Sequence, residues 1–168
     1  MAISDFTSSF SNLARPTLFD VSSIQVPSFV SGLDNVQFHA KATSIPTSNL
    51  GIIPVGYQGR KIKIPGDRTY DEWTVTFYND VGWNIRDAFE SWHNAISAPE
   101  SIYGEPILDN IFGSFSVAQK NNNNETIKTY TLEKAFPSVV GEIALDWDSN
   151  DAVETFDVTI AYSYFTSA

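Results

Sequence analysis

Residues 51–97 set the architecture of this chain, and they read GIIPVGYQGRKIKIPGDRTYDEWTVTFYNDVGWNIRDAFESWHNAIS. Polar and apolar side chains alternate over residues 61–64 and again over residues 73–78, which is the period of a strand with one wet face. Between these runs, residues 65–67 (Pro-Gly-Asp) have the composition of a turn. The period then lengthens to that of a helix. The region therefore predicts strand, turn, strand and helix in succession.

The predicted helix is amphipathic. Asn84 stands where it can cap the N-terminus, and Asp87 follows where a carboxylate suits the positive end of the helix dipole. The apolar residues of the helix recur every three or four positions, so they share one face. They are Ile85, Ala88, Phe89, Trp92 and Ile96.

Further strands are expected on both sides of this region. The pattern predicts them over residues 18–26, 36–42, 112–119, 126–133 and 155–164, with a polar hairpin tip at residues 121–124. The fold class is mainly β, an antiparallel sandwich or barrel with one helix packed at its end. The predicted core consists of Trp73, Val75, Phe77, Phe89, Trp92, Leu145, Trp147, Phe156, Val158 and Ile160.

Length and composition favour one domain spanning residues 1–168. The chain is rich in aromatic residues, with twelve Phe, seven Tyr and four Trp, and it has no cysteine, which excludes disulfides, thiol catalysis and cysteine-ligated metals. The first residues lack the basic and apolar regions of a signal peptide, and no apolar run approaches the roughly 20 residues of a membrane helix. A protein made in a cytoplasm, with no membrane partner, is expected.

Charge is distributed unevenly along the chain. The net charge of −10 argues against a protein that grips nucleic acid, because phosphate binding depends on Lys and Arg. Residues 60–68 nevertheless hold four basic side chains, whereas residues 135–168 hold acidic side chains and no basic one. This asymmetry fits either two solvated surfaces or two complementary faces of a self-associating subunit.

Residues 47–57 are predicted to form a loop with the Gly, Pro, Ser and Asn content of a connection, yet it carries several large apolar side chains. Loops that only connect elements are usually polar. The apolar side chains therefore indicate either contact with a partner or packing against the loop's own domain.

The sequence predicts no catalytic, cofactor-binding or metal site. His39 and His93 have no second histidine near them in the expected fold. Residues 146–151 begin like a calcium loop, but Asp151 occupies the sixth place, where such a loop needs glycine. No phosphate-binding glycine loop and no nucleophile elbow occurs. Enzymatic activity is not expected.

Several segments of the chain form a recognisable set, in a fixed order. They are residues 14–16 (Ala-Arg-Pro), 18–19, 41–43, 46, 53–56, 60–69, 73–76, 141–142, 145–150 and 155–159. In these segments the chain resembles the tail tube proteins of T4-like contractile-tailed bacteriophages. The resemblance covers nearly the whole chain in the same order, and it is weakest over residues 98–124.

The resemblance implies a structural virion protein that assembles in the host bacterial cytoplasm. Proteins of this kind form hexameric rings that stack into the inner tube of the tail. The sheath protein lies outside, baseplate and tail-terminator proteins lie at the ends, and phage DNA passes through the lumen without specific binding. The fold is also similar to that of type VI secretion tube proteins. Two parts are expected to join rings: an N-terminal arm (about residues 1–16) and an extended inter-ring loop (about residues 46–61).

A set of interface residues follows as a hypothesis. The basic residues are expected to meet carboxylates of an adjacent subunit, and part of the acidic set is expected to face the lumen, where it would repel DNA phosphates. The interface set is Leu50, Ile52, Ile53, Val55, Tyr57, Arg60, Lys61, Lys63, Arg68, Asp146, Asp148 and Asp151.

Two alternative functions remain open from the sequence. One is the tube of another contractile injection or secretion system, which would share the fold. The other is a β-sandwich glycan-binding module. The glycan-binding reading is disfavoured because Trp73, Trp92 and Trp147 are expected in the core.

Overall fold

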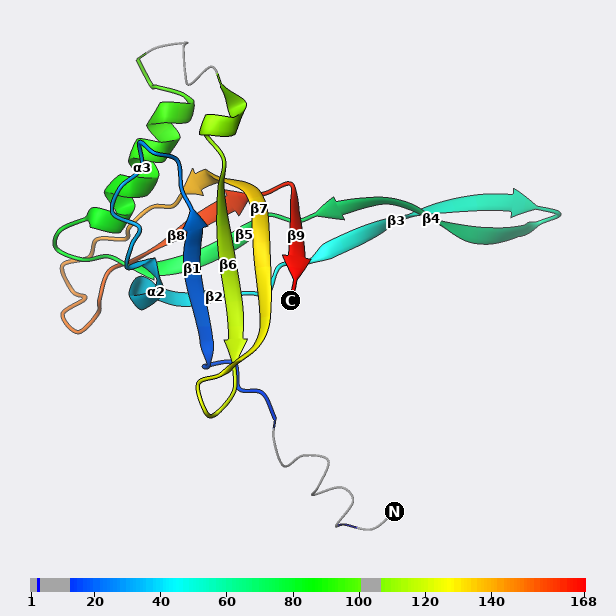
Figure 1. Cartoon of the computed structure of the whole chain (residues 1–168), viewed down its shortest axis with the longest axis horizontal. Coiled ribbons are helices and arrows are strands. Elements are labelled where there is room, and N and C mark those ends of the chain that lie inside the picture. The colour runs from blue at the N-terminus through cyan, green and yellow to red at the C-terminus, as the bar shows by residue number, and fades with distance from the viewer. Residues whose placement is uncertain (1–2, 4–12, 101–106) are drawn as a thin grey trace.

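A computed structural model describes residue 3, residues 13–100 and residues 107–168 of the chain (Figure 1). Most of the predicted N-terminal arm lies outside these described residues. In order, the elements are β1 (Phe19–Gln25), α2 (Val36–His39), β2 (Ala40–Thr43), β3 (Ser48–Tyr57), β4 (Arg60–Tyr70), β5 (Trp73–Tyr78), α3 (Asn84–Ile96), the 3-10 helix η1 (Leu108–Asn110), β6 (Gly113–Lys120), β7 (Thr126–Val140), β8 (Thr155–Ala161) and β9 (Tyr164–Ser167). Within the described ranges, no helix combines the length and the apolar character that crossing a membrane requires.

The main sheet is antiparallel throughout, in the order β1-β6-β7-β8-β5-β2, with β9 also paired to β7. The 15-residue strand β7 belongs to two halves of this sheet: its first part pairs with β6 and β9, and its last part pairs with β8. Between them the register with β6 shifts, and Lys134 has a φ of 53°. A bulge of this kind bends a strand, so the sheet curls around one core. The predicted mainly β, antiparallel fold is confirmed.

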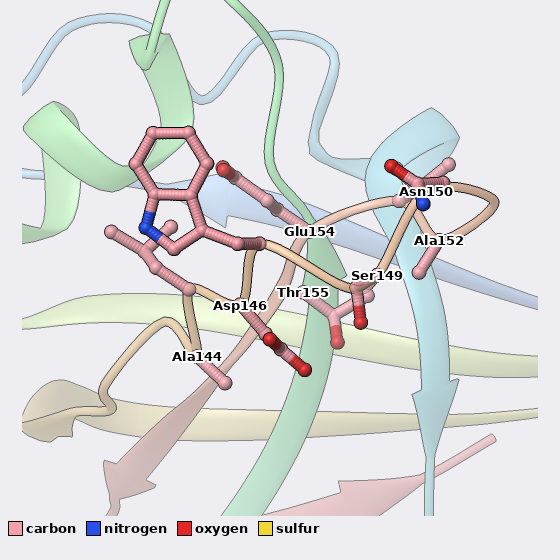
Figure 2. A pocket seen from close by; sticks show the side chains of 10 residues that line it. Ala144, Asp146, Ser149, Asn150, Ala152, Glu154 and Thr155 are labelled. Carbon is pink, nitrogen blue, oxygen red and sulfur yellow. The ribbon is translucent and has the colours of Figure 1, made fainter.

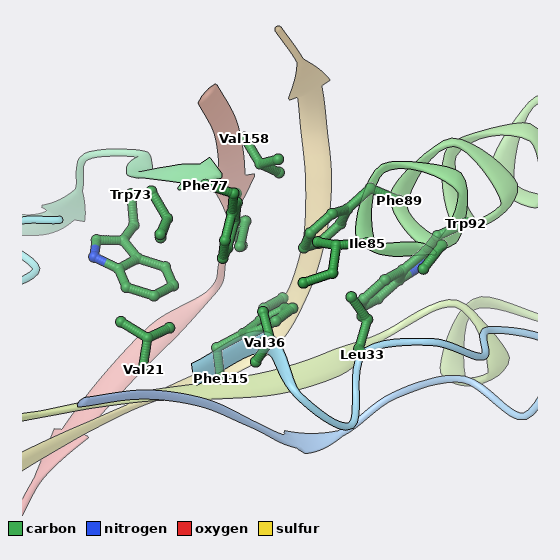
Figure 3. Packing of buried hydrophobic residues seen from close by; sticks show 14 of the residues in the cluster. Val21, Leu33, Val36, Trp73, Phe77, Ile85, Phe89, Trp92, Phe115 and Val158 are labelled. Carbon is green, nitrogen blue, oxygen red and sulfur yellow. The ribbon is translucent and has the colours of Figure 1, made fainter. Parts of the chain in front are cut away.

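Helix α3 closes the core on one side (Figure 3). The ring of Trp92 is fully buried and stacks on Phe115 with 6.0 Å between ring centroids, and its Nε1–H donates to the Ile111 carbonyl over 2.8 Å. A large aromatic side chain can be buried in this way because its one polar group is paired. The other predicted core residues that lie buried are Trp73, Val75, Phe77, Phe89, Phe156, Val158 and Ile160.

Two predicted core residues are exposed instead. Leu145 is 79% exposed and Trp147 is 100% exposed. They lie in the connection between β7 and β8, where Asp146 accepts hydrogen bonds from the backbone N–H groups of Asp148 and Ser149. Such local bonds favour turns over strands, so the chain does not continue as a strand after β7. The prediction that Leu145 and Trp147 belong to the core is therefore wrong.

The first predicted turn is also misplaced. Residues 65–67 lie inside β4, where a bulge shifts the register with β3. The reversal comes at Gln58 and Gly59, which have φ values of 48° and 79°. Residues 47–57, expected to form a loop, are almost entirely strand β3, and residues 36–42 form one helical turn followed by β2.

The N-terminus of α3 is capped by a different residue from the one expected. Asp80 accepts hydrogen bonds from the backbone N–H of Asn84 over 3.2 Å and from its side-chain Nδ2 over 2.9 Å. The hydrogen bond from the Asn84 side chain is the main cause that lowers the pKa of Asp80. Trp83, directly before the helix, adopts the left-handed conformation with a φ of 55°, and this turn in the backbone brings Asp80 close to Asn84. Asn84 therefore receives the cap rather than providing it.

Candidate assembly surfaces

The β3–β4 hairpin extends away from the rest of the molecule (Figure 1). Its two strands form a sheet of their own. Every residue in these two strands is exposed except Gly66 and Tyr70, which are partly buried. Two-stranded hairpins are marginally stable alone in water. The hairpin therefore has two broad faces that its own subunit leaves uncovered.

Residues paired across the two strands lie on the same face of the hairpin. One face, here called the apolar face, carries the pairs Ile53–Ile64 and Val55–Ile62, whose members are between 44% and 63% exposed. The pair Tyr57–Arg60 continues this face next to the turn. The opposite face, here called the lysine face, carries the pairs Gly56–Lys61, Pro54–Lys63 and, nearer the root, Ile52–Pro65. The hairpin thus offers two chemically different surfaces.

The root of the hairpin is fixed to the body. Asp71 accepts hydrogen bonds from Thr47 Oγ1 over 3.0 Å and from Asn49 Nδ2 over 2.8 Å. The ring of Tyr70 packs against those of Tyr162 and Phe165, with centroids 5.9 and 5.5 Å away. Burial of its hydroxyl raises the pKa of Tyr162, with smaller contributions from Asp71 and Tyr70. These contacts set the direction in which the hairpin leaves the subunit.

A second exposed surface is the connection between β7 and β8, residues 142–154, here called the acidic loop. It folds back on itself around a hollow (Figure 2), and three apolar side chains, Leu145, Trp147 and Val153, are at least 66% exposed. It contains no basic residue. Its carboxylates, all exposed, belong to Glu142, Asp146, Asp148, Asp151 and Glu154.

Arg86 of α3 anchors the start of the acidic loop. Its guanidinium donates to the Gly141 carbonyl over 2.8 Å, pairs with Glu90 over 2.6 Å, and lies over the Phe156 ring. Only 16% of the Arg86 side chain is exposed, so its bond to the Gly141 carbonyl is largely shielded from water, whereas the carboxylate side of the ion pair is 45% exposed. The loop is therefore held at its root as the hairpin is.

The predicted interface residues fall into two groups that lie far apart. The apolar and basic members all lie on the hairpin, and the three aspartates lie on the acidic loop, at the opposite end of the long axis (Figure 1). Among the described residues, ion pairs join Arg86 to Glu90 and Lys120 to Asp20, and neither pair involves the two surfaces. Within residues 13–100 and 107–168, the charges of the hairpin and the loop are thus not neutralised by such pairs.

A third surface is the outer face of β5 and β8, on the side opposite the buried core. Thr74 and Thr159 exchange a hydrogen bond of 3.2 Å, and Thr76 donates to Asp157 over 2.6 Å. These polar groups satisfy one another across the strands. The result is a polar wall of short side chains, here called the hydroxyl face.

Several contributors to these surfaces were not predicted from the sequence. The side chains of Ile62 and Ile64 belong to the apolar face, and their alternation with two lysines was a sufficient signal. Asp71 and Arg86 hold the roots of the hairpin and the acidic loop through contacts distant in sequence, for which the local pattern gives no signal.

The described residues offer no arrangement typical of a metal site. Across residues 13–100 and 107–168, no three His, Cys, Asp or Glu side chains gather closely enough to hold an ion. The exposed Trp147 removes one argument against a glycan-binding module.

The comparisons agree on one family. The family described as phage tail tube protein matches residues 6–168. The chain is 37% identical over 171 residues to tail tube protein gp19 of Enterobacteria phage T4, covering 98% of this chain and 99% of that protein. It is 31% identical over 142 residues to the tail tube protein of Serratia phage KSP90, covering 83% and 80%.

Solved structures show a similar fold. The cap of the anti-feeding prophage, a tube-terminating cap, aligns with a TM-score of 0.70 at 19% identity over 93% of this chain and 91% of that one. A sheath–tube complex of an extracellular contractile injection system aligns with a TM-score of 0.61 at 16% identity over 100% and 98%. A type six secretion system protein aligns at 0.50 with 10% identity over 89% and 82%.

Proposed function

We propose, from the premise that this chain belongs to the phage tail tube protein family, that its copies form hexameric rings that stack into the inner tube of a contractile phage tail. Membership makes it a structural component of the virion tail. The six-fold ring, the DNA conduit and the particular contacts are our proposal. Assembly in the host bacterial cytoplasm belongs to it as well.

The observation that carries the proposal is the uncovered hairpin. Four branched apolar side chains on one face of a two-stranded ribbon remain in water in the isolated subunit. Contiguous apolar surface of this kind marks an interaction site. A tube built from many copies would cover it, and the hairpin would then be the inter-ring element, together with an N-terminal arm of about residues 1–16.

Open strand edges support ring formation. Among the strands that the structure describes, β1 and β2 are the two ends of the main sheet order, and β9 pairs with β7 alone. Unpaired strand edges invite pairing with another chain, and a closed ring removes them. In this proposal neighbouring subunits continue the sheet around the ring and so build a shared inner barrel.

The hydroxyl face fits the wall of a DNA conduit. Its threonines pair with one another or with Asp157, so these residues offer a passing phosphate a neutral hydroxyl at most and no charged donor. Together with a net charge of −10, such a wall repels DNA and lets it pass without specific binding. The tube surface away from the lumen would contact the sheath, and baseplate and terminator proteins would bind at the ends.

Electron microscopy of the purified protein tests the assembly. We expect rings or tubes with six-fold symmetry in averaged images. Light scattering after chromatography should show a mass near six subunits or a multiple of it. Particles of another symmetry would contradict the hexamer, and a stable monomer at all concentrations would contradict self-assembly.

The tube of another injection system is the weaker alternative. The phage T4 protein is 37% identical to this chain, whereas the injection-system structures are 19% identical or less and show the fold alone. Neighbouring genes would decide the particle: phage sheath and baseplate genes are expected beside this one.

A further inference from the structure

Gly56 is a glycine that its own subunit does not require. A Cβ placed there would meet no atom within 4 Å, and its φ is not in the left-handed region, unlike those of Gly32 and Gly59. Glycine in a strand interior costs about 0.5–1 kcal/mol relative to alanine through lost chain entropy. Within the subunit, this residue therefore weakens β3 with no compensating contact.

Glycine within a strand often marks a place where another backbone approaches closely. Gly56 lies on the lysine face, directly opposite Lys61, and Pro54 beside it is paired with Lys63. The face therefore has a gap at Gly56, which has no side chain, between the apolar Pro54 on the same strand and the charged Lys61 on β4. Such a strip can take a peptide segment that brings carboxylates with it.

We propose that the lysine face lies against the acidic loop of a second copy, with Gly56 at the closest approach, and that the apolar face is covered by a third copy. The proposal rests on the proposed tube function and specifies its contacts. Each hairpin is then held between two neighbours, one through charge and one through apolar burial.

The acidic loop is the complementary surface. It holds five exposed carboxylates and no basic residue, and it lies at the end of the molecule opposite the hairpin (Figure 1). A contact between two different patches at opposite ends joins copies head to tail. Strands of ten residues span roughly 30 Å, so the hairpin reaches well beyond its own body.

Two neighbours are needed because the two faces have different chemistry. Burying carboxylates against the branched side chains of Val55 and Ile62 would remove their charges from water without a partner, which is costly. The lysine face suits the acidic loop better, because Lys61 and Lys63 can pair with its carboxylates. Ile52 and Pro54 on the same face can contact its exposed apolar side chains, which are Leu145, Trp147 and Val153. A ribbon has only these two faces, so covering both takes two contacts.

A size series at Gly56 tests the close approach. Gly56→Ala and Gly56→Leu should leave the urea midpoint of the monomer unchanged or raised. The concentration needed for tube assembly should rise with side-chain size, by about tenfold or more for Leu, because overpacking a tight contact is destabilising. Thr126→Leu, at an exposed strand residue of the body, is the control and should assemble like the unchanged protein. If all variants assembled at the same protein concentration, the proposal that another copy approaches closely at Gly56 would be wrong.

A mixing experiment tests the partner. A Lys61→Glu, Lys63→Glu variant should fail to form tubes alone, and so should a Glu142→Lys, Asp148→Lys, Asp151→Lys variant. The three loop substitutions change the charge of the acidic loop from −5 to +1 and keep Asp146, whose side chain holds the turn. Mixed in equal amounts, the two variants should form tubes, because the reversed hairpin of one then meets the reversed loop of the other. Failure of the mixture while the unchanged protein forms tubes would overturn the loop as partner. Failure of the unchanged protein would instead count against the proposed function.

The apolar face provides a second readout. Val55→Ser with Ile62→Ser should raise the protein concentration needed for assembly by the same factor at low and at high salt. Mixing this variant with the variant that carries lysines in the acidic loop should not restore assembly. Assembly through the lysine face should weaken as salt is added, because exposed charges are screened. If the loss of assembly caused by the lysine substitutions and the loss caused by the apolar substitutions changed with salt in the same way, the two faces would not contact separate surfaces.

Discussion

At the scale of single residues, identical amino acids have different reasons to be present. Gly113 is required by the fold, since a Cβ there would lie 2.6 Å from the Gln25 carbonyl oxygen and 2.6 Å from the Trp92 ring. Gly56 has no such neighbour. The surroundings of a glycine thus separate a folding constraint from an assembly constraint.

Gly113→Ala should therefore destabilise the subunit by about 1–3 kcal/mol, the usual cost of overpacking a buried site. Urea unfolding followed by tryptophan fluorescence would measure it. Gly56→Ala is the matched substitution and should show no loss. If the two variants unfolded at the same urea concentration, the contrast drawn here would be wrong.

Arg86→Met should remove the bond to the Gly141 carbonyl while keeping much of the side-chain volume. A largely buried hydrogen bond from a charged donor contributes about 1.5–3 kcal/mol, and we expect a loss of that size in the free energy of unfolding. Glu90→Gln serves as the control, because the carboxylate is 45% exposed and ion pairs at exposed sites contribute little. Equal losses in both variants would place the contribution in the ion pair instead.

Asp80 should make the stability of α3 depend on pH. Its folded-state pKa is lowered below the ordinary value of 3.8, mainly by the Asn84 side chain, so its stabilisation is present above that value. It is lost as the pH falls through the lower folded-state pKa. Asp80→Asn should unfold at lower urea than the unchanged protein at pH 7, and the gap should close in strong acid. A gap that stays constant with pH would contradict this.

At the scale of elements, the sequence predicted periodic segments well and non-local ones poorly. The strand at residues 73–78 and helix α3 appear where expected, because one face of each packs on the core and imposes its period. The β3–β4 hairpin was misread, because its turn residues lie in a bulge and its partner surface is outside the subunit. Trp147 was wrongly predicted to lie in the core, because the alternation of apolar residues in the sequence continues past Val140, where β7 ends.

Asp71→Ala should loosen the hairpin without unfolding the body. It removes the acceptor that holds Thr47 and Asn49, so amide hydrogens of β3 and β4 should exchange faster. Amides of β5 and β8 should keep their exchange rates, and they provide the internal control. Hydrogen exchange read by mass spectrometry would show this. If the amides of β3 and β4 exchanged at the same rate in the variant as in the unchanged protein, the aromatic contacts of Tyr70 would be sufficient to fix the root of the hairpin.

At the scale of the whole molecule, the family was accessible from the sequence, whereas the arrangement of its surfaces was not. Motifs spread along the chain indicated tail tube proteins, and the family match confirms this. The opposite placement of the hairpin and the acidic loop depends on how distant segments pack. No local pattern contains that information.

The hydroxyl face should determine how assembled tubes treat DNA. Thr74→Lys with Thr159→Lys would place two cations per subunit on this face, and tubes should then retain DNA at low salt and release it at high salt. Thr74→Ser with Thr159→Ser is the control and should retain none. Sedimentation of tubes with labelled DNA would measure retention. If the lysine variant retained no DNA, the face would not line the lumen.

One last consequence follows from the hairpin and the acidic loop lying at opposite ends of the molecule. Copies joined through these two surfaces all point the same way, so the growing structure has polarity. One terminus always presents vacant hairpins, and the other presents vacant loops. Elongation at each terminus can then be started or stopped by a different protein, each matching only one of the two exposed chemistries.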